Sequence, residues 1–339
     1  MLRRRKFGDL PDGTSVDVIT LGGPGGPGSP GSIEAQVLTY GCVIASLTVP
    51  DAHGVTANVV LGFDRLEQYV DSSPYFGAVI GRYANRIARA RFAIDGREYR
   101  VSANEPPHHL HGGFKGFDKR VWSAELSGNG QSVVFRRTSA DGEEDYPGAV
   151  DVEVSYTVVD HDFQIEYQAA SDAPTHVNLT QHSYFNLRGT GDVLAHCLAI
   201  NASTYLPVDE SLIPTGELAP VANSPFDFQE STAIGLRLHA EHEQLQRTGG
   251  YDHTFNINRL DSSLALAARA LDPSSRRTLE VRSTEPGLQF YSGQVVGHRG
   301  FCLEPQHYPD SPNRASFPST LLRPGERYQS TTVYTFGCD

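Results

Sequence analysis

The sequence predicts an all-β protein, a large antiparallel β-sandwich with a few short helices, and three observations lead to this prediction. Apolar and polar residues alternate with a period of two in many segments, as expected for strands that bury one face. Helical periodicity is scarce, and turn-forming residues are plentiful, with 33 glycines and 21 prolines spread over 339 residues. Many strands joined by short turns are typical of sandwiches and barrels.

In chain order, the strand pattern is clearest in five segments rich in β-branched and aromatic residues, which cover 32–41, 91–101, 132–139, 150–159 and 162–171. Within the second of them, Asp95-Gly96 separates two alternating runs, which is the strongest short-range signal of a β-hairpin. Short helices are expected over 64–73 and 240–248, whereas 262–272 fits either a helix or a strand.

We expect a single domain over residues 1–339, because no change of composition marks a linker and no internal repeat is evident. Length alone would suggest two domains, but all-β sandwiches and barrels routinely exceed the usual domain size. Segment 22–31 reads GGPGGPGSPG, a glycine–proline rhythm that is too short for collagen. We expect it to be a loop insertion.

The overall charge and the cysteines exclude several classes of protein. With 28 basic and 40 acidic side chains the net charge is −12, which would repel a nucleic-acid backbone. No apolar run is long enough to span a bilayer, and the basic N-terminus meets Asp9 and Pro11 before any apolar core, unlike a signal peptide. The 4 cysteines are far apart and form no Cys-x-x-Cys pair, so free thiols and a cytoplasmic location are expected.

The segment NLTQHSYFNLRG, residues 178–189, places a histidine in what otherwise reads as a β-strand. Asn178, Thr180 and His182 share one face of that strand, which is therefore too polar for a core. Tyr184 and Phe185 follow and could present flat apolar faces to sugar C–H groups. Taken alone, His182 is best interpreted as a structural histidine with satisfied hydrogen bonds.

Other polar stretches interrupt the strand pattern, and each has an ordinary structural interpretation. They contain His111 beside two glycines, the loop histidines His108 and His109, and the set Asn85, Arg86, Asp252, His253, Gln289, Glu304 and His307. Metal binding by His111, His182 and Glu304 is compatible with the residue types, but the close histidine spacings that would sharpen it are absent around His182.

Together these residue types suit proton transfer on a polyhydroxylated ligand. Histidine exchanges protons near neutral pH, and a carboxylate is a matching base. Arginine, asparagine, glutamine and aspartate supply directional hydrogen bonds to hydroxyl groups. We find no activated nucleophile, no phosphate-binding loop and no nucleotide fingerprint, so the inventory indicates proton-transfer chemistry on a sugar without a cofactor.

Eight motifs carry a resemblance to a known family: GRYANRIARARFAIDGREYRV, LHGGFKGFDKRVW, NLTQHSYFNLRG, YLPVDESLIPTGE, YDHTFNI, GLQFYSG, FCLEPQHYPDSPN and LRPGERYQSTTVYTF. In these motifs, which follow the family's order and cover nearly the whole chain, the sequence resembles the aldose 1-epimerase (galactose mutarotase) family. The resemblance implies a galactose-mutarotase-like supersandwich that interconverts the α and β anomers of aldoses such as galactose and glucose.

The resemblance also implies roles for individual residues. His182 matches the general acid that protonates the ring oxygen, Glu304 the general base that deprotonates the anomeric hydroxyl, and His111 a second histidine near the ring oxygen. Substrate-binding positions are matched by Asn85, Arg86, Asp252 and Gln289. The implied partner is a free monosaccharide, and we expect a monomer or a homodimer.

Three other functions stay open at this point. A non-catalytic sugar-binding module would be expected to lack the acid or the base, whereas His182 and Glu304 are both present. A glycosidase could use Asp252 and Glu304 as paired carboxylates. A sugar-phosphate epimerase is a neighbouring alternative, to which the acidic balance gives no support. The sequence departs from the family pattern in the 22–31 insertion and in a short interval between Gln289 and Glu304, and the second departure bears on substrate preference.

Overall fold

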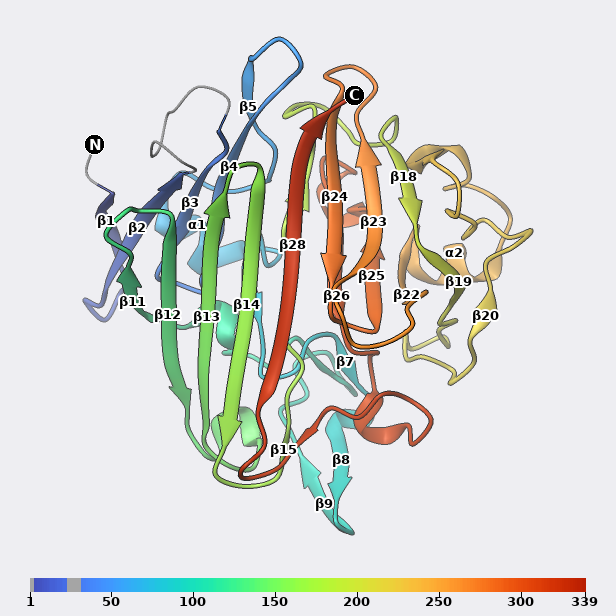
Figure 1. The fold of residues 1–339 in the computed structure, drawn as a ribbon. Helices are drawn as coiled ribbons and strands as arrows, with labels where there is room; N and C mark the ends of the chain where they lie inside the picture. The colour runs from blue at the N-terminus through green and yellow to red at the C-terminus, as the bar shows by residue number, and fades with distance from the viewer. Residues whose placement is uncertain (1–2, 23–31) are drawn as a thin grey trace.

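The computed structural model describes residues 3–22 and 32–339, and its strands form two stacked layers. One layer is a nine-stranded antiparallel sheet that faces the viewer in Figure 1. In spatial order it contains β11 (Ser123–Leu126), β12 (Ser132–Ser139), β13 (Val150–Val159), β14 (Asp162–Ser171), β28 (Tyr328–Cys338), β24 (Arg277–Ser283), β23 (Ala265–Leu271), β18 (Cys197–Ile200) and β21 (Thr232–Ala233).

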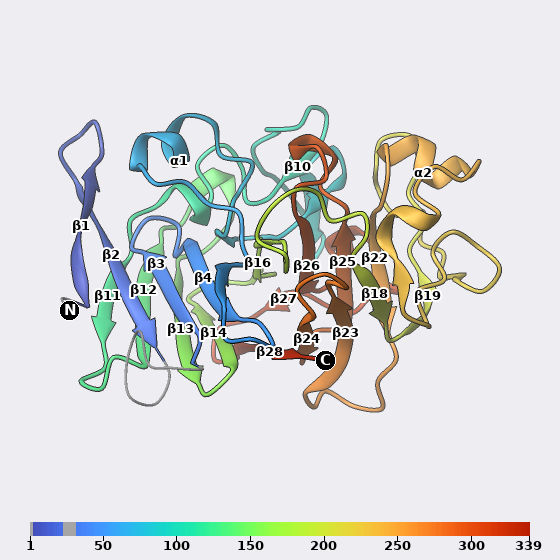
Figure 2. The ribbon, with the colours of Figure 1, turned by 90° about the horizontal axis from the view of Figure 1, so that it is seen from above.

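The second layer lies behind the first and holds a six-stranded and a five-stranded antiparallel sheet (Figures 1 and 2). The six-stranded sheet is, in spatial order, β17 (Tyr184–Phe185), β26 (Phe301–Gln306), β25 (Gly287–Tyr291), β22 (Asp252–Ile257), β19 (Ala202–Tyr205) and β20 (Ala219–Pro220). The five-stranded sheet is β1 (Arg4–Asp9), β2 (Ser15–Gly22), β3 (Glu34–Leu38), β4 (Ile44–Pro50) and β5 (Thr56–Asn58).

Short strand pairs and helices complete the fold. The pairs are β6 (Val79–Ile80) with β16 (Thr180–Gln181), β7 (Arg86–Ile87) with β10 (His109–Leu110), β8 (Arg91–Ile94) with β9 (Arg97–Arg100), and β15 (Thr175–His176) with β27 (Leu321–Leu322). The α-helices of the described residues are α1 (Leu66–Ser72) and α2 (Glu243–Thr248). Figure 2 shows α1, β10 and α2 on the side of the second layer that faces away from the nine-stranded sheet.

The hydrophobic core lies between the two layers. One cluster of buried side chains joins Val152 and Ile165 of the nine-stranded sheet to Phe290 and Leu303 of the six-stranded sheet. The same cluster contains residues from Ile19 to Phe336, which supports the single domain that we propose for this chain. Because side chains alternate along a strand, the residues between these core positions point to the outer face of the six-stranded sheet.

The predicted fold class is confirmed, and most of the expected elements form. Three predicted strands have the expected bounds, 132–139, 150–159 and 162–171. The expected helices become α1 and α2, and 262–272 contains a strand, β23. The Asp95-Gly96 turn joins β8 to β9 with φ of +51° and +81°, values typical of a two-residue hairpin turn.

Other expectations need a correction or fall outside the described residues. Segment 178–189 is not one strand: β16 ends at Gln181 and pairs with β6, whereas β17 begins at Tyr184 and pairs with β26. Apart from Gly22, the predicted loop insertion at 22–31 lies outside the described residues. Within the described part of the chain, no helix is long and apolar enough to cross a membrane.

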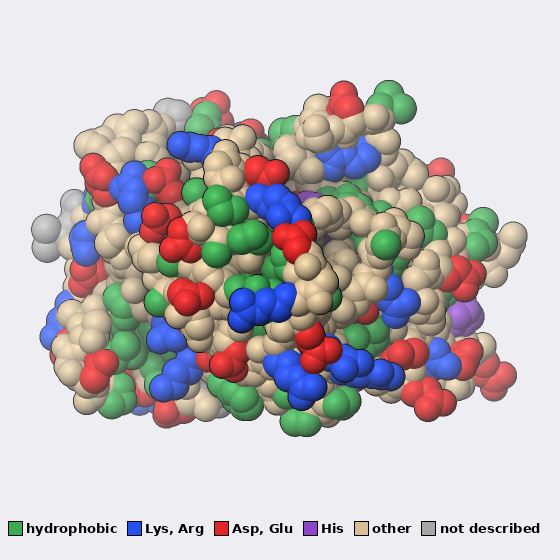
Figure 3. Space-filling model, turned by 90° about the horizontal axis from the view of Figure 1, so that it is seen from below, with side chains coloured by type: hydrophobic (Ala, Val, Ile, Leu, Met, Phe, Trp, Pro, Cys, Tyr) green, Lys and Arg blue, Asp and Glu red, His purple; other side chains and the backbone are tan. Residues whose placement is uncertain are grey.

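Figure 3 views the end of the sandwich that carries the β8–β9 hairpin, and basic and acidic side chains are interspersed on this face. Ion pairs such as Arg323–Asp95 and Arg91–Glu98 belong to this end of the molecule. A nucleic-acid site would need an extended basic patch, whereas this face mixes basic and acidic side chains.

Candidate active site

Three neighbouring strands of the six-stranded sheet place polar side chains in two rows on its outer face. Thr254 of β22, Gln289 of β25 and Glu304 of β26 are direct cross-strand partners and form one row. In the next row, Asp252 pairs with Tyr291, which pairs with Cys302. The register of this sheet therefore brings together residues that are up to 52 positions apart in sequence.

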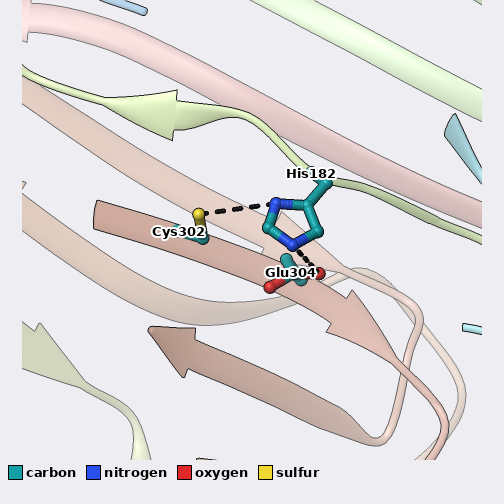
Figure 4. A group of neighbouring side chains, drawn as sticks. All are labelled: His182, Cys302 and Glu304. Carbon is teal, nitrogen blue, oxygen red and sulfur yellow. Dashed lines mark hydrogen bonds and ion pairs between the residues drawn. The ribbon is translucent and has the colours of Figure 1, made fainter. Parts of the chain in front are cut away.

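His182 reaches this surface from the break between β16 and β17. Its backbone N–H donates to Ala78 at 2.9 Å, and its carbonyl accepts a hydrogen bond from Gly77 at 3.1 Å. Satisfied backbone groups allow the chain to leave strand geometry in a buried place. The imidazole then points at β26, as Figure 4 shows.

His182 and Glu304 form a close, buried acid–base pair (Figure 4). Imidazole Nε2 lies 3.7 Å from carboxyl Oε2, and the residues are 5% and 2% exposed. Among the described residues, Oε2 of Glu304 has no hydrogen-bond partner. A buried acceptor without a partner costs free energy unless a ligand supplies a donor, which makes this oxygen the clearest mark of a binding site.

Burial drives both members of the pair toward their neutral forms. It raises the pKa of Glu304 well above its usual value, and the negative charge of Asp252 adds to that rise. Burial also lowers the pKa of His182 to about 4. Together the two side chains hold one proton, and the pair can pass a proton between two sites because neither charged form is strongly stabilised.

The plane of the His182 ring is set by two tyrosines. The ring lies 5.7 Å from that of Tyr75 at an interplanar angle of 22°, and 5.1 Å from that of Tyr184 at 20°. In the ring plane, Nδ1 faces the sulfur of Cys302 at 3.6 Å, whereas Nε2 faces Glu304. The sequence suggested that Tyr184 and Phe185 present flat faces to a sugar. In the structure, Tyr184 stacks on His182, and Phe185 packs in the core against Phe301 and Tyr334.

His111 lies beside His182, with 5.3 Å between the two ring centroids. Its Nδ1 accepts a hydrogen bond from the backbone N–H of Asn85 at 3.2 Å, so the neutral ring carries its hydrogen on Nε2. Burial and the charges of His182 and Arg86 hold the pKa of His111 well below its usual value. The ring is therefore a neutral hydrogen-bond donor. The loop that carries it requires Gly112, where a Cβ would lie 1.9 Å from the carbonyl oxygen of Gly81.

The remaining predicted binding residues form a hydrogen-bonded group. Gln289 donates to Oδ1 of Asp252 at 2.6 Å and accepts from the hydroxyl of Thr254 at 2.5 Å. Arg86 is held by both oxygens of Glu105, at 2.7 Å from Nε and 2.9 Å from Nη2. Burial raises the pKa of Asp252, and the charge of Arg86 opposes that rise, so these two side chains are electrostatic neighbours.

The seven predicted site residues are linked to one another by these contacts, while other histidines have structural partners. Both ring nitrogens of His109 are engaged, with Ser102 at 2.6 Å and with Tyr146 at 2.7 Å. His253 bonds Gln244 at 3.1 Å. Sequence reasoning missed Cys302, Tyr75, Glu105 and Thr254. Strand alternation in FCLE would have placed Cys302 on the same face as Glu304.

The described residues also contain one group of possible metal donors, which differs from the group considered from sequence. Ligand atoms of His182, Cys302 and Glu304 lie within 4.8 Å of one another, and Cys302 takes the place expected for His111. Nitrogen, sulfur and carboxylate oxygen are donors that zinc accepts. An ion bound there would occupy lone pairs of the imidazole and the carboxylate, which could then no longer accept protons.

Comparison with known proteins gives a consistent result. The family model described as aldose 1-epimerase matches residues 28–335. Galactose mutarotase from Rattus norvegicus is 43% identical over 350 residues, with 98% of both chains covered, and aldose 1-epimerase from Escherichia coli K12 is 36% identical over 342 residues, with 96% of both covered. The crystal structure of galactose 1-epimerase from Lactobacillus acidophilus superposes with a TM-score of 0.86 at 26% identity and covers 100% of this chain and 99% of that one. This chain therefore belongs to the aldose 1-epimerase family.

Proposed function

We propose that His182 and Glu304 are the acid and the base with which this chain opens and closes the ring of an aldose. Interconversion of aldose anomers is the activity of the chain, and the assignment of that activity to these residues is our proposal. The observation that carries the proposal is the buried pair itself, with 3.7 Å between Nε2 and Oε2 and no partner for Oε2 among the described residues.

The geometry suits the two oxygens that react. The anomeric hydroxyl and the ring oxygen of a cyclic sugar are bonded to the same carbon, so the groups that exchange protons with them must be close neighbours. Glu304 takes the proton of the anomeric hydroxyl while protonated His182 gives one to the ring oxygen, and the bond between the anomeric carbon and the ring oxygen breaks. The product is an open-chain aldehyde beside a neutral imidazole and a neutral carboxylic acid.

Reclosure reverses these transfers after the aldehyde carbon has rotated to present its other face. Protonated Glu304 returns its proton, neutral His182 accepts one, and the opposite anomer forms. Burial raises the pKa of Glu304 and lowers that of His182, so the surroundings favour the neutral pair that exists in the open-chain state. The buried site thus assists ring opening, the step that breaks the bond.

The other side chains hold the sugar in place. We propose that Arg86, Asp252 and Gln289 bind hydroxyl groups remote from the anomeric carbon, so that only the aldehyde end rotates. Neutral His111 donates from Nε2 toward the ring oxygen, and Asn85 fixes its tautomer through the backbone N–H. Galactose and glucose are the substrates we propose. No step uses a cofactor or a metal.

The wider setting is also a proposal. We propose a monomer or a homodimer, and the seven proposed site residues all belong to one chain. The cysteines, Cys42, Cys197, Cys302 and Cys338, are all free, which fits a reducing compartment such as the cytoplasm.

Polarimetry on freshly dissolved α-galactose tests the proposed roles. The parent protein should accelerate the approach to the anomeric equilibrium, and Glu304→Gln should reduce the accelerated rate by at least a hundredfold, roughly the lower end of what a positioned base contributes. Equal rates for the two proteins would remove Glu304 from the base role. Release of the leaving group from an aryl galactoside would instead support a glycosidase that uses Asp252 and Glu304.

A further inference from the structure

We propose that Cys302 is a positioning residue for the acid–base chemistry, whose sulfur accepts a hydrogen bond from Nδ1–H of His182 and thereby keeps Nε2 directed at Glu304. The sulfur lies 3.6 Å from Nδ1, on the opposite side of the ring from the carboxyl group (Figure 4). This inference rests on the proposed function of His182 and Glu304 and adds a third side chain to their pair.

The tyrosine contacts fix the plane of the His182 ring but not which edge of the ring faces Glu304, so a further group has to set that orientation. Tyr75 and Tyr184 lie nearly parallel to the imidazole, so they define its plane. A half-turn about the Cβ–Cγ bond keeps that plane but exchanges each ring nitrogen with a ring carbon. Flat aromatic faces do not distinguish the two orientations, whereas a hydrogen-bond acceptor at the ring edge does. The sulfur of Cys302, 3.6 Å from Nδ1, is such an acceptor, whereas Oε2 of Glu304 lies 3.7 Å from Nε2, too far for a hydrogen bond.

The strand that carries Cys302 also carries the base. Cys302 precedes Glu304 by two positions on β26, so both side chains point to the same face. Its backbone pairs with Tyr184 on one side and Tyr291 on the other, and the side chain is fully buried. A single strand, β26, thus sets the distance between the group that orients the imidazole and the group that exchanges protons with it.

The choice of sulfur has a chemical consequence. Burial raises the pKa of the Cys302 thiol well above its usual value, so the group stays neutral. A carboxylate in this position would stabilise the imidazolium and make it a weaker acid. A neutral thiol directs the ring without that stabilisation, and protonated His182 remains a strong acid toward the sugar ring oxygen.

The protonation state expected for the free enzyme follows from the same contacts. In the neutral pair, Nε2 lies 3.7 Å from protonated Glu304, too far for a hydrogen bond, so the carboxyl group does not by itself fix the imidazole tautomer. The sulfur of Cys302, 3.6 Å from Nδ1, fixes it by accepting the hydrogen that the neutral imidazole carries on Nδ1. Nδ1 keeps this hydrogen throughout the cycle, while Nε2 gains and loses the proton that reaches the sugar.

The experiment compares Cys302→Ala with Cys302→Ser, two replacements of similar size that differ by a hydroxyl group. Cys302→Ala should lower kcat roughly five- to tenfold, the change that one hydrogen bond of ordinary strength produces, with little change in KM. Cys302→Ser should retain more of the parent kcat. The matched control is Cys42→Ala, which removes a buried sulfur from the core and should leave kcat at the parent value.

Long-range ¹H–¹⁵N spectra of ¹⁵N-histidine-labelled protein supply a readout that does not depend on activity. The parent should show His182, assigned by its absence in His182→Asn, as the tautomer with hydrogen on Nδ1, and Cys302→Ala should show a mixture. A parent kcat in Cys302→Ala, or an Nε2–H tautomer in the parent protein, would overturn the proposal. Failure of the proposed function would appear differently, as an unchanged rate in His182→Asn.

Discussion

The pair His182–Glu304 and the pair His307–Glu285 combine the same two residue types, with a buried carboxyl group in each and with His307 only partly buried, yet their protonation is pushed in opposite directions. In the first, 3.7 Å separates Nε2 from Oε2, and that oxygen has no partner among the described residues. In the second, Nδ1 of His307 lies 2.5 Å from Oε2 of Glu285, and the other carboxyl oxygen accepts from Tyr328 at 3.1 Å.

The pKa values follow this difference. Burial acts against the charged form in both pairs, and in the proposed catalytic pair it prevails, raising the pKa of Glu304 and lowering that of His182. In the other pair the close contact outweighs burial, so the pKa of Glu285 is lowered and that of His307 is raised. A satisfied ion pair stabilises the fold, whereas an unsatisfied one is available for chemistry.

The largest expected effect is the loss of activity when His182, the proposed acid, is replaced. His182→Asn keeps a polar side chain of similar size but cannot protonate the ring oxygen at neutral pH, so kcat should fall roughly a hundred- to ten-thousand-fold. Polarimetry measures the rate, and thermal unfolding checks that the variant is folded. A rate near that of the parent would show that His182 has a structural role and that the two pairs do not differ in function.

The next effect is on stability, and it should be large for the His307–Glu285 pair and small for the His182–Glu304 pair. Glu285→Gln removes the buried carboxylate of an ion pair whose histidine is partly buried, and it should lower the free energy of unfolding by about 3 kcal/mol, while kcat of the folded protein stays unchanged. Glu304→Gln should leave that free energy equal or higher, because it removes a buried carboxyl group whose Oε2 lacks a partner.

Urea unfolding near pH 6 is the appropriate measurement for this comparison. The depressed pKa of Glu285 contributes stability above the unfolded glutamate value, and the raised pKa of His307 contributes stability below the unfolded histidine value. The pair therefore makes its full contribution to the free energy of unfolding only between about pH 4.5 and pH 6.5. A larger loss of stability in Glu304→Gln than in Glu285→Gln would contradict this prediction, because it would make Glu304 the more stabilising carboxyl group.

The dependence of activity on pH sharpens the contrast further. The reaction requires one proton on the pair, so the rate should fall at low pH when both groups are protonated and at high pH when both have lost it. Because the pKa of His182 is lowered to about 4, the acid limb should lie well below the ordinary histidine value of about 6.5. Enzymatic rates, corrected for spontaneous mutarotation in each buffer, test this expectation, and an acid limb near 6.5 would contradict it.

The smallest expected effect is none at all. Dialysis against EDTA should leave the mutarotation rate unchanged, because each proposed step uses only side chains of this chain. Loss of the rate on chelation, restored by Zn²⁺, would instead assign an ion to the donors His182, Cys302 and Glu304. Activity after dialysis against buffer alone is the control.

Many strands, one hairpin turn and the candidate site residues can be predicted from the sequence, because each depends on a short stretch of residues. Strand alternation specifies β12, β13 and β14 with their bounds, since each exposes one face and buries the other. Asp95-Gly96 specifies a hairpin because both residues tolerate a positive φ. The family motifs predict the seven candidate site residues one by one, without any knowledge of how they meet.

Tertiary structure alone decides what those residues do to one another. The register of β22, β25 and β26 sets Thr254, Gln289 and Glu304 side by side, and no local pattern encodes a cross-strand distance. The break after Gln181 turns His182 out of the strand that its sequence suggested. Two histidine–glutamate pairs that look alike as residue types differ because burial, partner distance and hydrogen bonding set a pKa, and these are properties of packing rather than of sequence.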